Sequence, residues 1–155
     1  MNKAFMAEAI ALSIEKMEAG EGGPFGAVVV KDGKVVGRGW NCVTSANDPT
    51  AHAEVMAIRD ACKNLGAFDL TGCKLYASCE PCPMCLSAIY WARIDKLFFA
   101  ATRSDATAAG FDDELIYCEV SKPWKNRQLP AEQIMHVEAQ KAFDAWKEKE
   151  NRTAY

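Results

Sequence analysis

Two short stretches of the chain carry side chains that bind metal ions. His52 lies in one of them, and Cys82 and Cys85 lie in the other, about thirty residues later and three positions apart. An imidazole and two thiolates are ligands that zinc prefers, and three protein ligands leave the fourth tetrahedral position open, as in catalytic sites. The sequence therefore predicts one zinc ion per subunit, held by His52, Cys82 and Cys85.

Glu54 lies two residues after His52 and is not needed as a ligand. A glutamate in the first turn of a helix also stabilises the helix dipole, so its position alone does not require a chemical role. Next to zinc, which makes a water molecule acidic, a carboxylate can accept the proton of the attacking water and pass it on. We therefore predict that Glu54 is the catalytic proton-transfer residue.

Cys79 provides an alternative, because it forms a second C-x-x-C spacing with Cys82. Four protein ligands would make the zinc site structural, and the chain would then be a zinc-stabilised interaction domain without catalytic activity. Cys79 precedes Pro81 at the end of an expected strand, so its side chain would have to reach back around a turn. This position favours a thiol near the site or in the core.

The composition is that of an ordinary globular protein. The chain has 155 residues, of which 50% are hydrophobic, and we expect one domain, residues 1–155. Its net charge of −3 gives no general attraction for phosphate backbones, which argues against a nucleic-acid partner. The sequence has no signal-peptide pattern and no apolar run long enough for a membrane span. The chain has seven cysteines, an odd number, and thiols that bind a metal fit a reducing compartment better than disulfides do. The protein is therefore expected to be cytoplasmic, with no membrane partner.

The hydrophobic pattern predicts alternating strands and helices. Asp32-Gly33 separates two apolar stretches and predicts a hairpin. An α/β sheet with helices on its faces is expected, its first two strands antiparallel and its later strands parallel. Residues 42–50 and 102–110 are expected to be loops, the second with some helical character. The expected helices are residues 3–19, 52–65, 82–92, 112–119 and 141–150, and the expected strands are residues 25–30, 34–40, 74–78, 96–101 and 132–137.

The predicted helices would bring the metal ligands together. Cys82 and Cys85 would lie on one face of the first turn of their helix. The partial positive charge of a helix N-terminus favours thiolate over thiol. His52 would begin a second helix whose first turn faces the same point, so two helix starts would converge on one cation.

The order H-x-E, then P-C-x-x-C, is the known signature of zinc-dependent nucleobase deaminases. On this motif the chain resembles the cytidine deaminase-like superfamily, and within it the bacterial guanine deaminases. The resemblance extends through Gly-Phe-Asp-Asp at residues 110–113 and to the C-terminal tyrosine. The segments that carry it are residues 22–27 (GGPFGA), 47–54 (NDPTAHAE), 78–85 (SCEPCPMC), 88–93 (AIYWAR) and 109–113 (AGFDD).

The resemblance implies a three-layer α/β/α sandwich with a mixed, mostly five-stranded sheet, and the hydrolysis of guanine, a small purine base, to xanthine and ammonia. It implies that Asn41 is a purine-binding amide, that Asp113 contacts the guanine edge and that Phe25 forms a stacking wall. It also implies a homodimer in which the C-terminal segments, about residues 130–155, exchange between subunits. The substrate-binding residues expected on this basis are Asn41, Phe25, Ala53, Asp113 and, from the partner subunit's C-terminus, Tyr155.

Other functions share the same metal chemistry. A tRNA adenosine deaminase would act on a flipped base and would need a basic surface around its pocket. A cytosine or cytidine deaminase is a further enzymatic alternative. The zinc-stabilised interaction domain is the alternative that is not an enzyme.

Overall fold

The computed structural model describes residues 2–155 and divides the chain into two compact units, Met1–Tyr117 and Cys118–Tyr155. The first unit contains the sheet and most of the helices. Helix α6 (Glu114–Val120) crosses the boundary between the units. That residues 1–155 act as one zinc-dependent domain with an exchanged C-terminal segment stays a prediction.

The sheet of the first unit has four strands in the order β2-β1-β3-β4. Strand β1 (Gly26–Lys31) pairs antiparallel with both β2 (Lys34–Trp40) and β3 (Cys73–Cys79), and β3 pairs parallel with β4 (Lys96–Ala101). The β1–β2 turn has positive φ at Asp32 and Gly33, the combination that favours a tight two-residue hairpin. The predicted hairpin and the predicted parallel crossover are both confirmed.

The fifth strand expected at residues 132–137 is wrong. Among the described residues the sheet has only four strands, and residues 131–135 have no regular structure. Helix α7 (His136–Glu148) begins directly after them, five residues earlier than the expected helix at 141–150. A short apolar stretch fits a strand and a helix equally well, so its period could not distinguish them.

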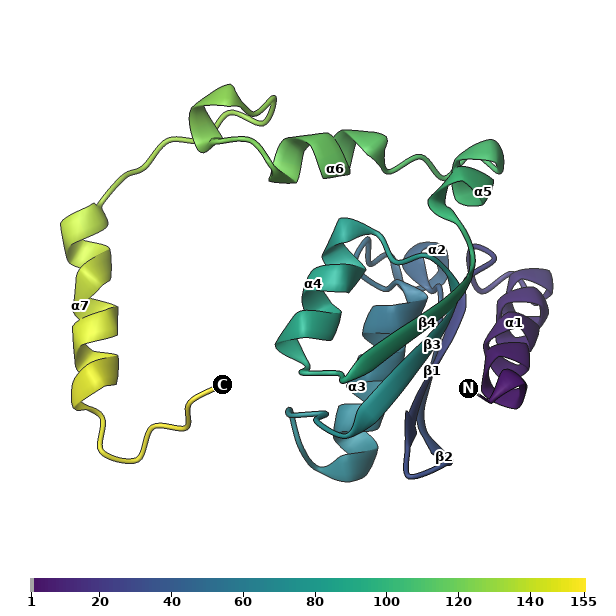
Figure 1. The fold of residues 1–155 in the computed structure, drawn as a ribbon. Helices are drawn as coiled ribbons and strands as arrows, with labels where there is room; N and C mark the ends of the chain where they lie inside the picture. The colour runs from purple at the N-terminus through teal and green to yellow at the C-terminus, as the bar shows by residue number, and fades with distance from the viewer. Residues whose placement is uncertain (1) are drawn as a thin grey trace. The chain divides into compact units, whose positions relative to one another are not determined.

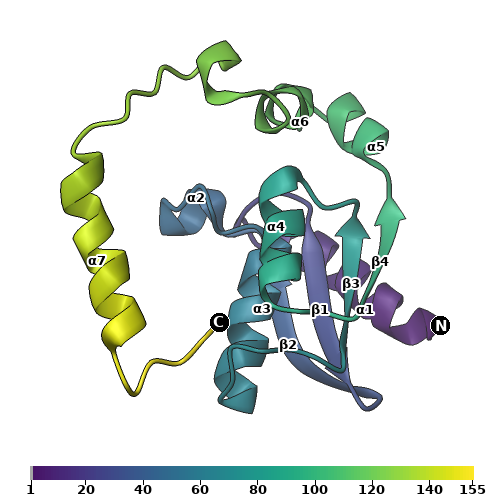
Figure 2. The same cartoon turned by 60° about the vertical axis from the view of Figure 1, so that its left-hand side comes forward.

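Helices cover both faces of the sheet, which gives the three-layer α/β/α arrangement (Figure 1). Helix α1 (Lys3–Glu18) lies on one face, and α3 (Ala53–Leu65) and α4 (Pro83–Trp91) lie on the other, as a second view also shows (Figure 2). Val28 and Tyr76 face α1, whereas Val29 and Leu75 face α3 and α4 in the larger core cluster. Alternate residues of one strand therefore bury on opposite faces, as the pleat requires.

Two glycines let α3 approach β2 closely. A Cβ atom on Gly39 would lie 2.2 Å from the backbone oxygen of Ala53, and one on Gly37 would lie 2.4 Å from that of Ala57. Ala53 and Ala57 are themselves small and fully buried. This contact holds the first turn of α3 next to the end of β2, where the chain continues into Asn41.

The expected loops contain short helices. Helix α2 (Val43–Ala46) lies in the 42–50 segment, and α5 (Arg103–Ala108) lies in the 102–110 segment. Thr102 and Asp105 form a reciprocal capping box at the start of α5, which satisfies two otherwise unpaired backbone N–H groups. Local capping thus stabilises a helix that its small residues only weakly indicated.

The second unit contains a 3-10 helix (Trp124–Asn126) and α7. Several large apolar side chains of this unit are exposed, among them Val137 at 69% and Phe143 at 68%. None of the helices formed by residues 2–155 combines the length and apolar composition needed to cross a membrane.

Candidate active site

The three predicted zinc ligands meet at one point of the first unit. The Nδ1 atom of His52 lies 3.6 Å from the Sγ atoms of both Cys82 and Cys85. All three ligand atoms lie within 4.8 Å of one another, and no other such group of three was found among residues 2–155. Tetrahedral zinc bonds of about 2.1 Å to nitrogen and about 2.3 Å to sulfur separate those two atoms by about 3.6 Å. The donor set therefore fits a zinc ion.

Two helix starts hold these ligands. His52 is the N-cap residue of α3, and Cys82 is the N-cap residue of α4, with Pro83 in the first turn. Proline is tolerated there because the first N–H groups of a helix have no partner within the helix. Both N-cap residues have an extended backbone, so the side chains of His52 and Cys82 branch from the chain just before their helices begin. The predicted convergence of two helix N-termini is confirmed.

The protons of the three ligand side chains are distributed unequally. The pKa of Cys82 falls to about 4, chiefly because the thiol of Cys85 donates a hydrogen bond to its sulfur, and His52 adds to the effect against the opposing effect of burial. The same hydrogen bond and burial raise the pKa of Cys85. The hydrogen bond to Cys82 also raises the pKa of His52. The cluster therefore holds a thiolate at Cys82 beside a thiol at Cys85, and a bound cation would displace the proton of that thiol.

Glu54 lies in the first turn of α3 and is 8% exposed. Burial raises the pKa of its carboxyl group above the ordinary range, because removal from water disfavours the charged form. A buried carboxyl group with a raised pKa at the edge of a cavity can take up and release a proton. Its position beside the His52 cluster agrees with the predicted role.

Cys79 does not complete a four-ligand cluster. Its side chain is buried at the end of β3, and its Sγ atom donates to the backbone oxygen of Thr102 at 3.5 Å. Among the described residues, the metal-binding group contains only His52, Cys82 and Cys85. The structure thus has the three-ligand arrangement and not the structural alternative.

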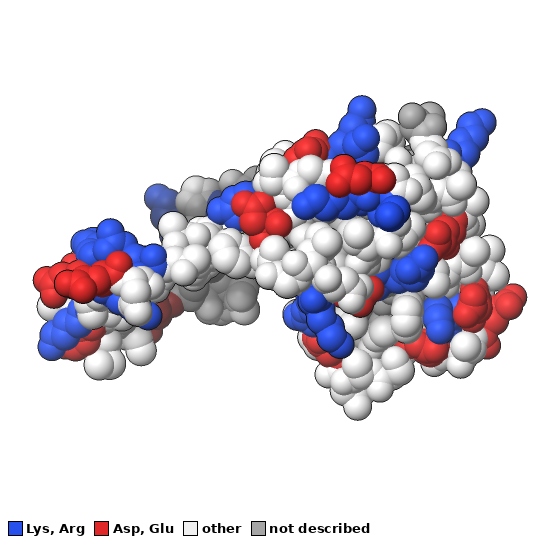
Figure 3. Space-filling model, turned by 90° about the horizontal axis from the view of Figure 1, so that it is seen from below, with Lys and Arg blue, Asp and Glu red and all other residues white. Residues whose placement is uncertain are grey.

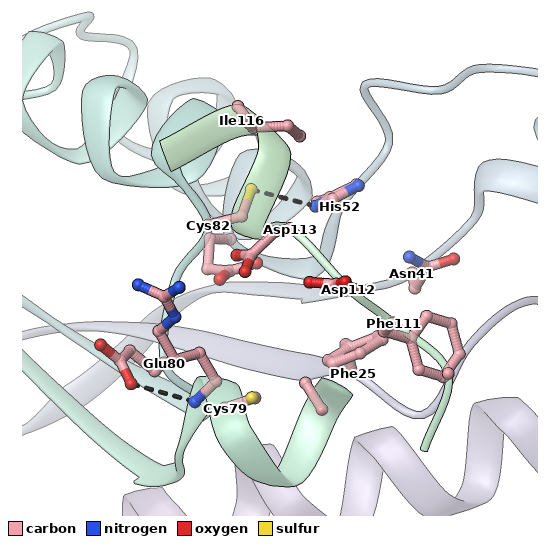
Figure 4. A pocket seen from close by; sticks show the side chains of 14 residues that line it. Phe25, Asn41, His52, Cys79, Glu80, Cys82, Phe111, Asp112, Asp113 and Ile116 are labelled. Atoms are coloured by element: carbon pink, nitrogen blue, oxygen red, sulfur yellow. Dashed lines mark hydrogen bonds between the residues drawn. The ribbon is translucent and has the colours of Figure 1, made fainter. Parts of the chain in front are cut away.

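A cavity of about 300 Å³ opens beside this cluster (Figure 4). Its size lies at the lower end of the range for small-molecule sites, which suits a ligand as small as a nucleobase. The cavity is formed by the start of α3, the segments that follow β2 and β3, and the segment from α5 to α6. Its lining residues are Phe25, Asn41, His52, Glu54, Cys79, Glu80, Cys82, Arg103, Ala106, Gly110, Phe111, Asp112, Asp113 and Ile116.

Backbone contacts fix the orientation of Asn41. Its Oδ1 atom accepts hydrogen bonds from the backbone N–H groups of Gly23 and Val43, both at 3.2 Å. The amide oxygen is thus occupied by the backbone, and the NH₂ group is the part that can meet a ligand. The turn before β1 is tight at this point, since a Cβ atom on Gly22 would lie 2.0 Å from the backbone oxygen of Asn41.

An aromatic pair and a carboxylate complete the cavity. The rings of Phe25 and Phe111 meet edge to face, with centroids 4.9 Å apart (Figure 4). Asp113 lies opposite them, beside Cys82 (Figure 4). Burial raises the pKa of Asp113, and the charge of Arg103 opposes this shift.

Two of the residues expected to bind substrate are not among those that line the cavity in the described part of the chain. Ala53 is fully buried and packs against Gly39. Tyr155 belongs to the second unit, and its side chain is 74% exposed. The roles expected for both residues stay predictions.

The sequence did not point to several lining residues. Phe111 and Asp112 lie within the Gly-Phe-Asp-Asp segment, but only Asp113 was given a role there. Glu80 lies between the expected strand and the Cys82 helix, and its position beside the motif was the available signal. Arg103 and Ile116 carry no local signal, because only the path of the chain after β4 brings them to the cavity.

The fold and the three-ligand site define a zinc-binding deaminase domain. Residues 1–101 match the model of the cytidine and deoxycytidylate deaminase zinc-binding region, and the chain belongs to this family.

Particular relatives extend the similarity beyond that region. The chain is 53% identical to the guanine deaminase of Bacillus subtilis (strain 168) over 154 residues, which cover 99% of both chains. It is similar to the X-ray structure of guanine deaminase from Bacillus subtilis with a TM-score of 0.97 and 54% identity, over 100% of this chain and 99% of that one. The tRNA-specific adenosine deaminase of Aquifex aeolicus (strain VF5) is 46% identical over 78 residues, 50% of this chain and 52% of the relative.

Proposed function

We propose that the chain catalyses the hydrolytic deamination of guanine to xanthine and ammonia. The observation that carries this proposal is the 53% identity to a guanine deaminase along 99% of both chains. The similarity to a tRNA adenosine deaminase stops at about half of the chain. The full-length match includes residues 110–113 and the C-terminal segment, which lie outside the zinc-binding region.

His52, Cys82 and Cys85 would hold the zinc ion. When bound by three protein ligands, zinc supplies the Lewis acidity that makes a water molecule nucleophilic at neutral pH. The paired thiols and the imidazole begin in a hydrogen-bonded arrangement that already contains one thiolate. These residues therefore need little rearrangement to serve as ligands.

Glu54 would move the protons. Its carboxylate takes a proton from the attacking water and delivers it to the ring nitrogen beside the attacked carbon. The carboxylate then takes the proton of the hydroxyl group added to that carbon and transfers it to the exocyclic amino group, so that a C=O bond forms as the C–N bond breaks and ammonia leaves. The raised pKa of the buried carboxyl supports this role, because a general acid-base works best with a pKa near the working pH.

Asn41, Phe25 and Asp113 would hold the base. The NH₂ group of Asn41 can donate to a purine ring nitrogen or to the guanine O6 atom, which are acceptors. The carboxylate of Asp113 can accept from an N–H group of the guanine ring, a donor that this base presents. Phe25 offers an apolar face for the flat ring. A site with one fixed donor and one acceptor discriminates between bases more strongly than an apolar pocket does.

We further propose a homodimer in which about residues 130–155 exchange between subunits and Tyr155 contributes to the partner's site. The large apolar side chains that the second unit exposes support an association, because their burial against a partner would be favourable. A single functional domain, residues 1–155, would then be completed only in the dimer. We also propose a cytoplasmic location, where thiolate ligands stay reduced.

The tRNA adenosine deaminase remains the second candidate, since part of the chain is similar to such enzymes. Against it, the net charge is −3, and basic side chains alternate with acidic ones on the face seen in Figure 3. Binding to a tRNA anticodon stem-loop at moderate salt separates the two functions. Tight binding that weakens steeply as salt rises would favour the tRNA substrate.

A panel assay tests the main proposal. Ammonia release is measured from guanine, adenine, cytosine, cytidine and guanosine, with zinc content measured on the same preparation. We expect the highest kcat/KM with guanine. We expect the protein to contain about one zinc ion per chain. A higher kcat/KM for adenine, cytosine or cytidine than for guanine would overturn the substrate assignment. A zinc-loaded protein that is inactive on every base would favour the interaction domain.

A further inference from the structure

We infer that Arg103 and Tyr117 are positioning residues that hold Asp113 over the substrate pocket by tying α6 to the segment before Cys82. The inference rests on the proposed function for its consequence in catalysis. Its structural content is a set of contacts within the first unit, and neither residue has to touch the substrate.

Helix α6 needs such a tie. It has seven residues, and none of them is buried. A helix this short is not stable in water by itself, because nucleation is costly and few hydrogen bonds follow it. Asp113 stands directly before α6, and its backbone oxygen accepts from the N–H groups of Ile116 and Tyr117 at 3.0 and 3.2 Å. The position of Asp113 therefore depends on where this first turn is held.

Arg103 contacts the first turn of α6 in two ways. Its guanidinium group forms an ion pair with the carboxylate of Glu114, and its Cζ atom lies 4.2 Å from the ring centroid of Tyr117. A planar guanidinium can pair and stack at the same time, which a lysine cannot do as well. Both contacts fall within four residues of Asp113.

The backbone of Arg103 reaches the metal-binding segment. Its N–H group donates to the Oε2 atom of Glu80 at 3.0 Å, the interaction drawn as a dashed line at Glu80 in Figure 4. The Tyr117 hydroxyl donates to the backbone oxygen of Pro81, also at 3.0 Å. Glu80 and Pro81 directly precede the zinc ligand Cys82. Two connections thus join the α5–α6 region to this segment.

These contacts form a closed loop of interactions. It runs from Pro81 through the Tyr117 hydroxyl and ring to Arg103, and from Arg103 back to Glu80. A loop of this kind couples the position of Asp113 to the metal site. The backbone oxygen of Asp113 bonds to the first turn of α6, and this turn cannot move away from Pro81 and Arg103 without breaking at least one of these contacts. We call it the Arg103–Tyr117 lock.

Hydrogen exchange tests the lock without reference to catalysis. The reporters are the N–H groups of Ile116 and Tyr117, which bond to Asp113. In Tyr117→Phe, which keeps the ring and loses the hydroxyl, we expect exchange about fivefold faster, the effect of losing one typical hydrogen bond. Arg103→Met should give a larger increase. Unchanged exchange at both amides in both variants would overturn the inference.

Two controls show that the effect is local. Amides at the start of β3, such as that of Leu75, should exchange as in the parent protein, because they lie at the end of the strand away from Glu80. Arg93→Met is the matched control, because Arg93 has an exposure comparable to that of Arg103 and pairs with Asp69. This pair lies at the end of α4 opposite to Cys82, so the exchange rates of the Ile116 and Tyr117 amides should not change. Faster exchange throughout the sheet would mean that the variants only destabilise the fold, which contradicts the lock.

A double-mutant cycle tests whether Arg103 acts through Asp113. We expect Arg103→Met and Asp113→Asn each to lower kcat/KM for guanine by about tenfold or more, mainly through KM, at unchanged zinc content. The double variant should be within about twofold of Asp113→Asn alone. Arg103→Lys, which keeps the charge, should recover part of the loss. If the losses of kcat/KM in the two single variants multiply in the double variant, the inference is overturned and the proposed function stays intact. If the parent protein has no activity on guanine, the proposed function is contradicted, and the hydrogen-exchange experiment alone decides whether the lock exists.

Discussion

The imidazole of His52 lies against the thiol of Cys85, with Nδ1 and Sγ 3.6 Å apart, although 33 positions separate the two residues in the chain. His52 caps α3 and Cys85 lies in the first turn of α4. Each helix packs on the same face of the sheet (Figure 1). The ligand set therefore exists only when both helices are in place, and metal binding is coupled to folding of the first unit.

Replacing one ligand should remove the metal and lower stability. In Cys85→Ser we expect zinc content to fall from about one to well below half an equivalent. The melting temperature should fall by about 5–10 °C, because a ligand that binds only the folded state stabilises it. Elemental analysis and thermal unfolding measure the two effects. Cys62→Ser, at a half-buried thiol outside the cluster, is the control and should keep its zinc; full zinc occupancy in Cys85→Ser would remove Cys85 from the ligand set.

Removing the proton-transfer group should abolish turnover without removing zinc. Glu54→Gln keeps the shape of the side chain but cannot accept the proton of water. We expect kcat for guanine to fall by about 10²- to 10⁴-fold, the usual effect of losing a positioned general acid-base. Steady-state kinetics and zinc content on one preparation provide the measurement. Turnover near that of the parent protein would exclude Glu54 from proton transfer.

Two adjacent glycines should tolerate a methyl group very differently. A Cβ atom on Gly22 would lie 2.0 Å from the backbone oxygen of Asn41, whereas one on Gly23 would lie at an ordinary 3.4 Å from Phe111 and Phe25. Gly22→Ala must therefore displace Asn41, at a cost of about 1–3 kcal/mol typical of overpacking. We expect its melting temperature to fall by about 2–10 °C and its KM for guanine to rise.

Gly23→Ala is the matched control, and it should change the melting temperature and the KM for guanine only slightly. Thermal unfolding and steady-state kinetics of the two variants in parallel make the comparison. Equal behaviour of Gly22→Ala and Gly23→Ala would show that the backbone at Asn41 can move without consequence. Substrate binding would then not depend on the fixed orientation of the Asn41 amide.

The proposed exchange of C-terminal segments can be tested by complementation. Removal of Tyr155 should lower guanine turnover and leave zinc content unchanged. Glu54→Gln should also be inactive, but it supplies an intact C-terminus. If Tyr155 serves the partner's site, a mixed dimer of the two variants contains one complete site.

Unfolding and refolding the two variants together should therefore restore activity. Random assortment makes half of the dimers mixed, each with one of its two sites complete, so about a quarter of the parent activity is expected from two-fold symmetry. The separate variants, refolded alone, are the control. Activity of the mixture no higher than that of the two separate variants would contradict an exchanged tyrosine, and a monomer by light scattering would contradict the dimer itself.

Much of the first unit could be predicted from local patterns. Alternating and helical periods gave β1 to β4, α1, α3 and α4, and Asp32-Gly33 gave the hairpin. Cys82 and Cys85 share a helical turn, so their proximity follows from spacing alone. The pattern failed at residues 132–137, where a short apolar stretch forms no strand and continues into α7. It also gave no indication of Arg103, because an arginine after a strand is compatible with many environments.

The sequence by itself determined the kind of chemistry: the identities of His52, Cys82 and Cys85 specify a zinc site, and Glu54 supplies a group that can carry a proton. Tertiary structure alone decided that Cys79 faces Thr102 and not the cluster, that backbone N–H groups hold the oxygen of Asn41, and that Arg103 meets Tyr117. The reason is physical. Ligand chemistry belongs to individual side chains, whereas the direction of a side chain depends on contacts between segments that are distant in the chain.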